Sequence, residues 1–479
     1  MILNKDLKGR RKVVIPITKE EFNEDIVGSL KKYLQDALKI HNKNVKDFTY
    51  LHNVYLGQHD ILTDKKRYDS SEINNMSIEN HINKIVNFKV GFMYGNPIDY
   101  SIINAKNTDD LKHFNTYMID ANKSSLDIEK AQDLYETGLA YQLILPRPTT
   151  EIEDIKSDSP FVLQNLPLDK TCVVYSNDIP NKELFGLVIS SRIKKHKEEK
   201  LYNIFLPELK IVLDEKFTLV SSIAQSHKFQ PIIEYSINKA RMGIIELVVF
   251  LQNQINKINS LQLDDIEENV NCFMALFNQR ADDDFIKKFK ELKQERVVLL
   301  STANPQTPAD IKMLSSKLEQ DAINLFYERT VKALYDISAT PQASGNVTSG
   351  GDTGQARILG NGWESAQNQA QVDQTYLLQF ERKLCRNIIS ICKKLSNCPI
   401  KEINASDIAI KFNINMSNNL LIKSESAKML SEINMPEKTI LAICGLTNDI
   451  DGVGDQWIAK KQEVQQQEQS KINQGVNNN

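Results

Sequence analysis

The sequence lacks the patterns that mark secreted and membrane-spanning proteins. Its six cysteines form no CxxC pair, and in a chain of 479 residues they predict thiols in a reducing compartment rather than a disulfide framework. The longest apolar run, Ile244–Leu251, is far shorter than the roughly 20 residues that span a bilayer. Residues 1–16 have no long apolar core, so no signal peptide is predicted. We therefore expect a protein made in the cytoplasm, without a membrane anchor.

An excess of one charge is also missing. The chain has 59 basic and 62 acidic residues, so its formal net charge is only −3. Proteins that grip DNA statically usually carry a basic excess, because their affinity comes from neutralising phosphates. Two interpretations stay open: the protein does not touch DNA, or it touches DNA that must keep moving.

The motifs of common enzymes are absent. Gly345 and Gly350 have the spacing of a phosphate-binding P-loop, but Gly351 and Asp352 stand where Lys and Ser or Thr are required. The seven histidines form no HExxH or HxH pattern, and no GxSxG motif is present. We read the acidic runs at 264–268 and 282–284 as helix caps rather than metal ligands. The sequence predicts no cofactor, no metal and no catalytic site.

Three short basic clusters lie at 10–12, 194–200 and 287–290. Each could contact nucleic acid, but a solvated helix face or turn explains such clusters more often. They do not decide the function.

The first half of the chain predicts an α+β domain. Amphipathic helices are expected over 19–40 and 78–93, followed by a short strand at Ile98–Ile102. Between Leu139 and Ile233 the hydrophobic period changes to two, which predicts an antiparallel sheet of short strands. A chain of this length is expected to form two to four structural units.

The second half predicts an antiparallel helical hairpin with a small insert at its tip. One helix begins near Lys239. Another is expected from Pro308 to about Ser338, because Thr307, Pro308 and Asp310 form a helix-start pattern. Between them, strands at 270–278 and 295–301 flank a charged helix at 282–293, in β-α-β order.

The Gly-rich segment that follows, Ala339–Gly354, is small and polar and cannot bury a core. A long helix is expected over 355–395 with a kink at Gly360 and Gly362. A strand over 407–416, helices over 424–433 and 437–444, and a disordered Gln/Asn-rich tail over 462–479 complete the prediction.

This layout resembles the portal proteins of tailed bacteriophages, of the type found in Bacillus siphophages. The resemblance covers roughly Tyr50 to Gln462 and is carried by four stretches in order. The first is NHINKIVNFKVGFMYGNPIDYS (80–101). The second is 232–260, in which a strand, a glycine and a helix bearing Asn256 and Ser260 follow one another. The third is the Gly/Ser segment before a long helix, and the fourth is DIAIKFNINMSNN (407–419). The sequence departs from the family pattern at 349–352.

The resemblance implies an α+β multidomain portal fold and a ring, expected as a dodecamer, at one vertex of the virion capsid. It implies a wing (1–238 and 355–420), a helical stem hairpin (239–262 and 308–338) and a β-α-β clip (263–307). It further implies a tunnel loop (339–354) and a helical crown (421–461). The partners implied are double-stranded DNA, the terminase large subunit, a head–tail adaptor, and the major capsid and scaffolding proteins.

Two sets of residues are predicted to act in these roles. The tunnel loop would face DNA, and the clip would meet the motor and later the adaptor. The loop residues are Ser344, Asn346, Thr348, Ser349 and Thr353, and the clip residues are Asp284, Lys287, Lys288 and Lys290. Two alternatives remain: another head–tail adaptor, although adaptors are usually shorter, and a nucleic-acid-processing enzyme.

Overall fold

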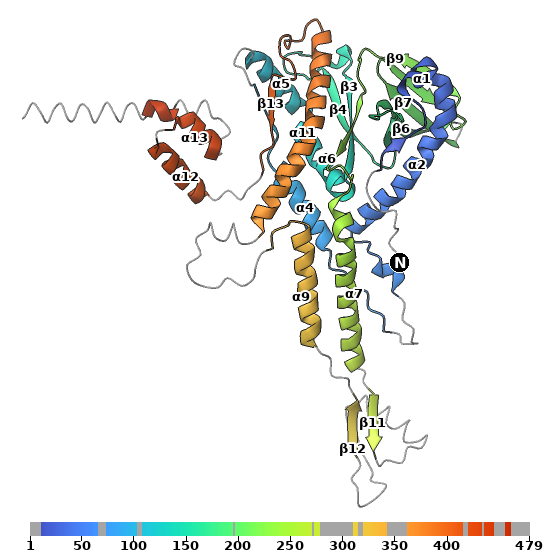
Figure 1. The fold of residues 1–479 in the computed structure, drawn as a ribbon, viewed down its shortest axis with the longest axis vertical. Coiled ribbons are helices and arrows are strands. Elements are labelled where there is room, and N and C mark those ends of the chain that lie inside the picture. The colour runs from blue at the N-terminus through green and yellow to red at the C-terminus, as the bar shows by residue number, and fades with distance from the viewer. Residues whose placement is uncertain are drawn as a thin grey trace, which may run out of the picture. The chain divides into compact units, whose positions relative to one another are not determined.

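The computed structural model describes most of the chain, in two compact units formed by residues 1–414 and 415–479. The described residues are 11–65, 73–102, 108–194, 197–270, 273–277, 310–314, 320–342, 362–414, 420–433, 435–444 and 456–460. Figure 1 shows the elements of the chain.

The larger sheet has six strands in the order β1-β5-β6-β7-β8-β9. The pairs from β5 to β9 are antiparallel, which confirms the prediction from the period-two pattern. The N-terminal strand β1 adds to this sheet parallel to β5. The strands are β1 (Val13–Val14), β5 (Thr171–Tyr175), β6 (Glu183–Lys194), β7 (Lys197–Leu206), β8 (Leu209–Leu213) and β9 (Leu219–Ala224).

Two helices pack on this sheet. The prediction of one helix over 19–40 is wrong at its end: α1 spans Lys19–Glu24 and α2 runs from Ile26 to Tyr55. Asp25 ends one helix and caps the next by accepting a hydrogen bond from the Gly28 amide. The helix α2 continues because its buried stripe continues through Phe48, Leu51 and Val54.

A second core lies among a three-stranded sheet, order β10-β3-β4, and several helices. The predicted helix over 78–93 is confirmed as α4 from His81 onward, but residues 78–80 lie before it. The predicted strand at 98–102 is confirmed as β2, which pairs with β13. The elements are β3 (Leu139–Pro146), β4 (Phe161–Leu166), β10 (Ile232–Ser236), β2 (Asp99–Ile102), β13 (Ile408–Lys411), α3 (Ile61–Asp64), α4 (His81–Tyr94), α5 (Thr108–Asp120), α6 (Lys123–Thr137) and α11 (Trp363–Lys394).

The predicted helical hairpin is present, with different bounds. Helix α7 spans Ile244–Val270 and packs along α9, Gln320–Ile337. The prediction of a helix starting at Pro308 is wrong, because Asp310–Leu314 is strand β12, paired antiparallel with β11 (Phe273–Phe277). Pairing with β11 overrides the local helix-start pattern. The predicted helix at 282–293 and strand at 295–301 lie outside the described residues.

The prediction of a kink at Gly362 is also wrong, because α11 begins directly after it. Gly362 has φ +83°, a left-handed conformation that suits glycine and lies outside the helix. In the second unit, the two predicted helices are confirmed as α12 (Leu420–Glu432) and α13 (Glu437–Cys444). They pack through Ala427, Ile440 and Cys444.

Candidate functional site

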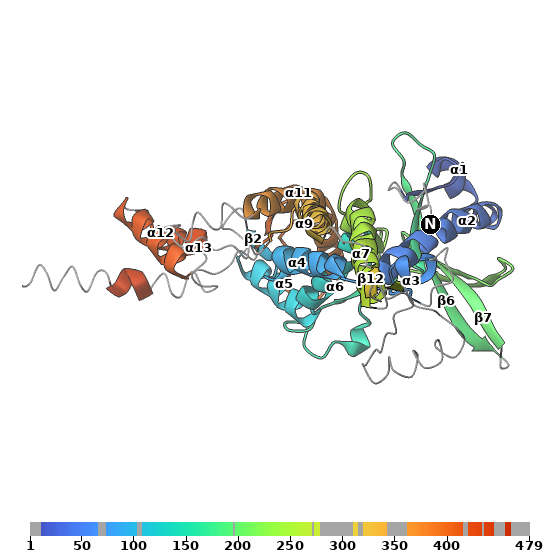
Figure 2. The same cartoon turned by 90° about the horizontal axis from the view of Figure 1, so that it is seen from below.

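The helices α7 and α9 lie side by side in both views of the chain (Figures 1 and 2). Their contact is partly apolar, since Ile255 of α7 and Leu334 of α9 are fully buried. It is also polar, since the Gln262 side-chain amide donates to Asn324 at 3.2 Å. The hairpin is therefore a packed unit.

Residues 73–81, an extended segment that ends at the first residue of α4, are bound along α7 by a row of side chains that we call the polar ladder. The ladder residues recur at every fourth position of α7. Each accepts a hydrogen bond from one backbone amide of the segment, and the donating amides are every second one along it. The pairs are Gln252 with His81 (3.1 Å), Asn256 with Glu79 (3.2 Å), Ser260 with Ser77 (2.9 Å) and Asp264 with Asn75 (2.7 Å).

The geometry of the two backbones explains this match. Four helical residues rise about 6 Å, and two residues of an extended chain span about 6.6 Å. Side chains four apart on a helix therefore stay in register with alternate amides of an antiparallel extended strand. All four ladder side chains are buried. Sequence reasoning had singled out Asn256 and Ser260 through the family resemblance but had given them no role.

The interpretation of Asp264 as part of a helix cap is wrong. Asp264 was read as part of an acidic helix cap, but it lies in the C-terminal half of α7 and forms an ion pair with Lys65 at 2.5 Å. Burial alone would raise the pKa of Asp264, yet the hydrogen bonds from Lys65 and Asn75 outweigh it and lower the pKa. The acidic residue therefore fixes the end of the 73–81 segment.

Helix α9 also contacts the same segment. The Tyr327 hydroxyl donates to the Glu79 carboxylate at 2.5 Å, and the Tyr335 hydroxyl is 3.1 Å from Nδ1 of His81. Asn259 of α7 also donates to Glu79, at 3.1 Å. The segment thus ties the two helices of the hairpin together.

The Gly-rich segment begins directly after α9, and its first residues are anchored. Lys89 of α4 donates from Nζ to the carbonyl oxygen of Ala339 at 3.0 Å, where Ala339 has φ +47°. Burial lowers the pKa of Lys89 to about 8. The carboxyl of Asp373, which accepts from the Tyr135 hydroxyl at 3.2 Å, lines the same small cavity of about 90 Å³. Burial raises the pKa of Asp373.

At this same end of the hairpin, the start of α7 is joined to the N-terminal segment by Arg11. Its Nη1 donates to Glu246 at 2.6 Å, to the carbonyl of Arg241 at 2.9 Å and to that of Thr137 at 3.0 Å. The Asp47 carboxylate lies 3.6 Å from its Nε. Neither earlier interpretation of the 10–12 basic cluster holds for Arg11, because the guanidinium is buried and paired.

Two glycines make this junction possible. A Cβ added to Gly243 would lie 2.2 Å from the carbonyl oxygen of Glu136, and one on Gly138, which has φ +84°, would lie 2.5 Å from the carbonyl carbon of Arg241. The backbones at the end of α6 and before α7 therefore touch directly. This crossing lies immediately before the first turn of α7.

The residues predicted to face DNA or the packaging motor cannot be placed on this framework. Ser344, Asn346, Thr348, Ser349 and Thr353 lie outside the described residues. So do Asp284, Lys287, Lys288 and Lys290. Within the described ranges, no group of three His, Cys, Asp or Glu side chains could hold a metal ion. No helix in the described part of the chain is both long and apolar enough to cross a bilayer.

The comparison with protein families decides the identity. A model described as "Phage portal protein, SPP1 Gp6-like" matches residues 34–471. The chain belongs to this portal family. Portal proteins connect head and tail in the virion, so this chain is a phage virion component of a structural, non-enzymatic family. Membership also implies assembly into an oligomeric ring associated with a capsid.

Among solved structures, this portal chain is similar to a chain of the "Virion of native gene transfer agent (GTA) particle". The two share 11% sequence identity with a TM-score of 0.43, and the match covers 84% of this chain and 94% of that one. No curated protein sequence matches this portal chain.

Proposed function

We propose that the ring of portal chains is the channel through which viral DNA is packaged into the capsid, retained and later ejected. The observation that supports this role best is the order of three elements. A rigid helical hairpin, α7 and α9, is followed immediately by a Gly-rich segment whose first residue, Ala339, is tied to the framework by Lys89. A segment of small polar residues that starts from a fixed base suits contact with a moving duplex.

The parts of the chain take the following roles in this proposal. The hairpin forms the stem, and the two sheets with their helices form the wing. Residues between α7 and α9, including paired β11 and β12, form the clip. Residues 339–354 form the tunnel loop, and α12 and α13 belong to the crown.

The chemistry of the loop fits sliding. Each phosphate neutralised by a fixed positive charge releases counterions and deepens the binding, which would hold DNA in place. The net charge of the chain is close to zero, which avoids such strong binding of DNA. Hydroxyl and amide groups of Ser344, Asn346, Thr348, Ser349 and Thr353 form hydrogen bonds that break easily. The energy for movement comes from a separate ATPase, the terminase large subunit.

The clip is the proposed docking surface for that motor during packaging and for the head–tail adaptor afterwards. Its charged helix candidate carries Asp284, Lys287, Lys288 and Lys290. The major capsid and scaffolding proteins surround the wing and crown during assembly in the host cytoplasm. DNA passes through the ring without a cofactor.

Deleting residues 346–350 tests the channel role. We expect rings of normal mass, since the deletion leaves α9, Ala339 and α11 in place, but slower packaging or a shorter packaged genome. The measurement is an in vitro packaging assay with the purified motor, using a deletion of 465–469 as the matched control. Packaging at the normal rate and length by the 346–350 deletion would argue against a role of the loop in translocation.

A further inference from the structure

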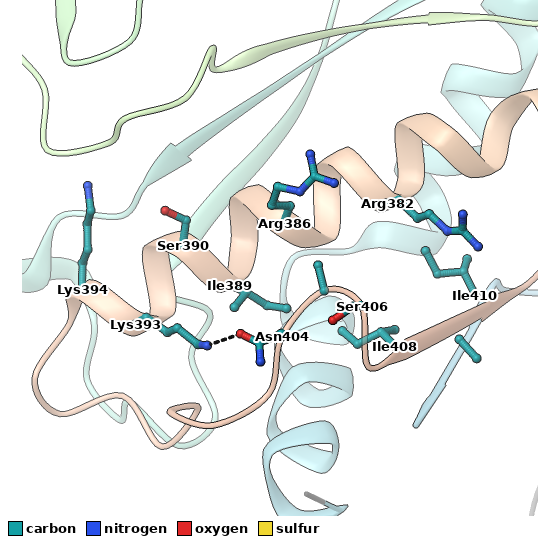
Figure 3. Close-up of a pocket in the computed structure, with 12 residues that line it drawn as sticks. Arg382, Arg386, Ile389, Ser390, Lys393, Lys394, Asn404, Ser406, Ile408 and Ile410 are labelled. Carbon is teal, nitrogen blue, oxygen red and sulfur yellow. Dashed lines mark hydrogen bonds between the residues drawn. The ribbon is translucent and has the colours of Figure 1, made fainter. Parts of the chain in front are cut away.

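A basic groove lies between α11 and β13, on the part of the chain formed by residues 382–410. It encloses about 970 Å³, at the upper end of the volumes found for ligand sites. Figure 3 shows the side chains that line it. Arg382, Arg386, Lys393 and Lys394 line it from α11, and Ile408 and Ile410 line it from β13.

The charge of this groove is unbalanced. Four of its twelve lining residues are cationic and none is acidic. Arg382 and Arg386 are one helical turn apart and exposed, and neither has an ion-pair partner among the described residues. Lys393 donates to the Asn404 side chain at 2.8 Å, and Lys394 donates to the Ser226 carbonyl. The two guanidinium groups are therefore available to an anionic ligand, and each can bind a carboxylate through two parallel hydrogen bonds.

The second wall is an open strand edge. β13 pairs with β2 in a two-stranded sheet, and within the described ranges no further strand pairs with β13. An open edge presents unpaired backbone N–H and C=O groups, which accept an added strand. Ile410 is partly exposed and supplies apolar surface between this edge and α11, while Ile389 and Ile408 line the groove but are buried (Figure 3).

We propose that this groove binds an acidic, extended peptide segment of a partner protein, which pairs with the open edge of β13. Carboxylates of the peptide contact Arg382 and Arg386, and one of its aliphatic side chains packs on Ile410. The phosphates of a DNA duplex could bind the arginines, but a duplex has no backbone that pairs with a strand edge and no aliphatic side chains for the apolar part of the groove. The features together therefore favour a peptide. This proposal is independent of the channel role.

The test measures binding of labelled twelve-residue peptides to the full chain by fluorescence anisotropy. The probe alternates Glu and Val. One comparison peptide alternates Lys and Val. A second keeps every Glu but replaces alternate Val by Pro, which removes the N–H groups that a strand needs. We expect the Glu/Val peptide to bind at least tenfold more tightly than either, and to slow hydrogen exchange at residues 408–411.

Protein variants locate the site. Arg382→Glu with Arg386→Glu should weaken binding at least tenfold. Lys31→Glu with Lys39→Glu makes the same charge change at exposed positions of α2 and should alter binding less than twofold. Equal binding of the Pro-containing peptide would overturn the strand pairing. Two other results would overturn the proposal. One is a DNA duplex that displaces the peptide and whose binding is lost in the arginine variant. The other is self-association of the chain that is lost in the arginine variant, because each result assigns the groove to another occupant.

Discussion

At the scale of single residues, helices α6 and α11 share a buried group of four charges. Lys123, Asp127 and Lys130 of α6 meet Glu381 of α11, with Lys130 Nζ 2.7 Å from both Asp127 and Glu381. All four side chains are almost fully buried, and their charges sum to zero. Such groups cost desolvation energy and are stable only while every partner is present. The group therefore fixes α11 against α6.

Removing one charge should be costly. We expect Glu381→Gln to lower the free energy of unfolding by about 3 kcal/mol, because it leaves two buried ammonium groups facing one carboxylate. Urea unfolding followed by circular dichroism measures the change. Glu364→Gln, at the exposed start of the same helix, is the control and should change stability by less than about 0.5 kcal/mol. Equal stability of both variants would contradict the assigned role of the cluster.

The same carboxylate should also shape the acid response. Burial alone would raise the pKa of Glu381, but Lys123 and Lys130 outweigh it and lower the pKa from 4.5 to about 2. A lowered carboxyl pKa stabilises the fold above pH 4.5, and this contribution is lost as the pH falls toward 2. The difference in stability between wild type and Glu381→Gln should therefore shrink as the pH falls from about 5 to about 2.

At the scale of elements, the polar ladder explains how a long helix can carry buried Gln, Asn and Ser without penalty. Buried polar groups are tolerated when each has a partner. Here the partners are backbone amides of the 73–81 segment, which has no strand neighbour to satisfy them. The helix replaces a strand as the hydrogen-bonding edge. The ladder makes the stability of the α7–α9 hairpin depend on a segment far away in the sequence.

Replacing one ladder residue should loosen the segment. We expect Asn256→Ala to cost about 1–3 kcal/mol, because the Glu79 amide and the His59 ring lose a buried partner. Hydrogen exchange at Glu79 should become faster while the amides of α7 stay protected. Gln254→Ala, on the exposed side of the same helix, should leave exchange at Glu79 unchanged. If Glu79 exchanged equally slowly in both variants, another contact would have to hold the segment.

These elements also show what sequence reasoning could and could not reach. The period-two strands of β5 to β8 and the apolar stripe of α7 were predictable, because burial on one face leaves a repeating pattern. The strand β12 was not, because Pro308 and Asp310 suggest a helix start and its strand partner β11 lies far back in the chain. The ladder was missed because its residues are polar, and polar residues at helical spacing usually indicate a solvated face. The residues expected to touch DNA remain predictions.

At the scale of the whole molecule, the hairpin of a single protomer is poorly covered. Leu247, Phe250 and Leu261 fall along one exposed stripe of α7, and Leu325 and Phe326 are exposed on α9. Phe250 and Leu325 are 56% and 69% exposed. Apolar side chains gathered on paired helices mark a protein–protein contact surface. In a ring, the natural cover for one hairpin is the hairpin of the next subunit, through a head-to-tail interface that closes by rotation.

Charges placed on that surface should therefore stop assembly without unfolding the protomer. We expect Phe250→Asp with Leu325→Asp to shift the mass from about 650 kDa, for twelve copies of a 54.6 kDa chain, toward the single chain. Each buried apolar side chain contributes about 1.5–3 kcal/mol, and every interface of a ring carries both changes. Mass photometry gives the masses, and circular dichroism should be unchanged because both residues are exposed. Ile193→Asp, an exposed apolar residue outside the hairpin, should still form rings. If the double variant still formed rings, the contact between subunits would have to lie outside α7 and α9. The hairpin would then not be expected to form the wall of the channel.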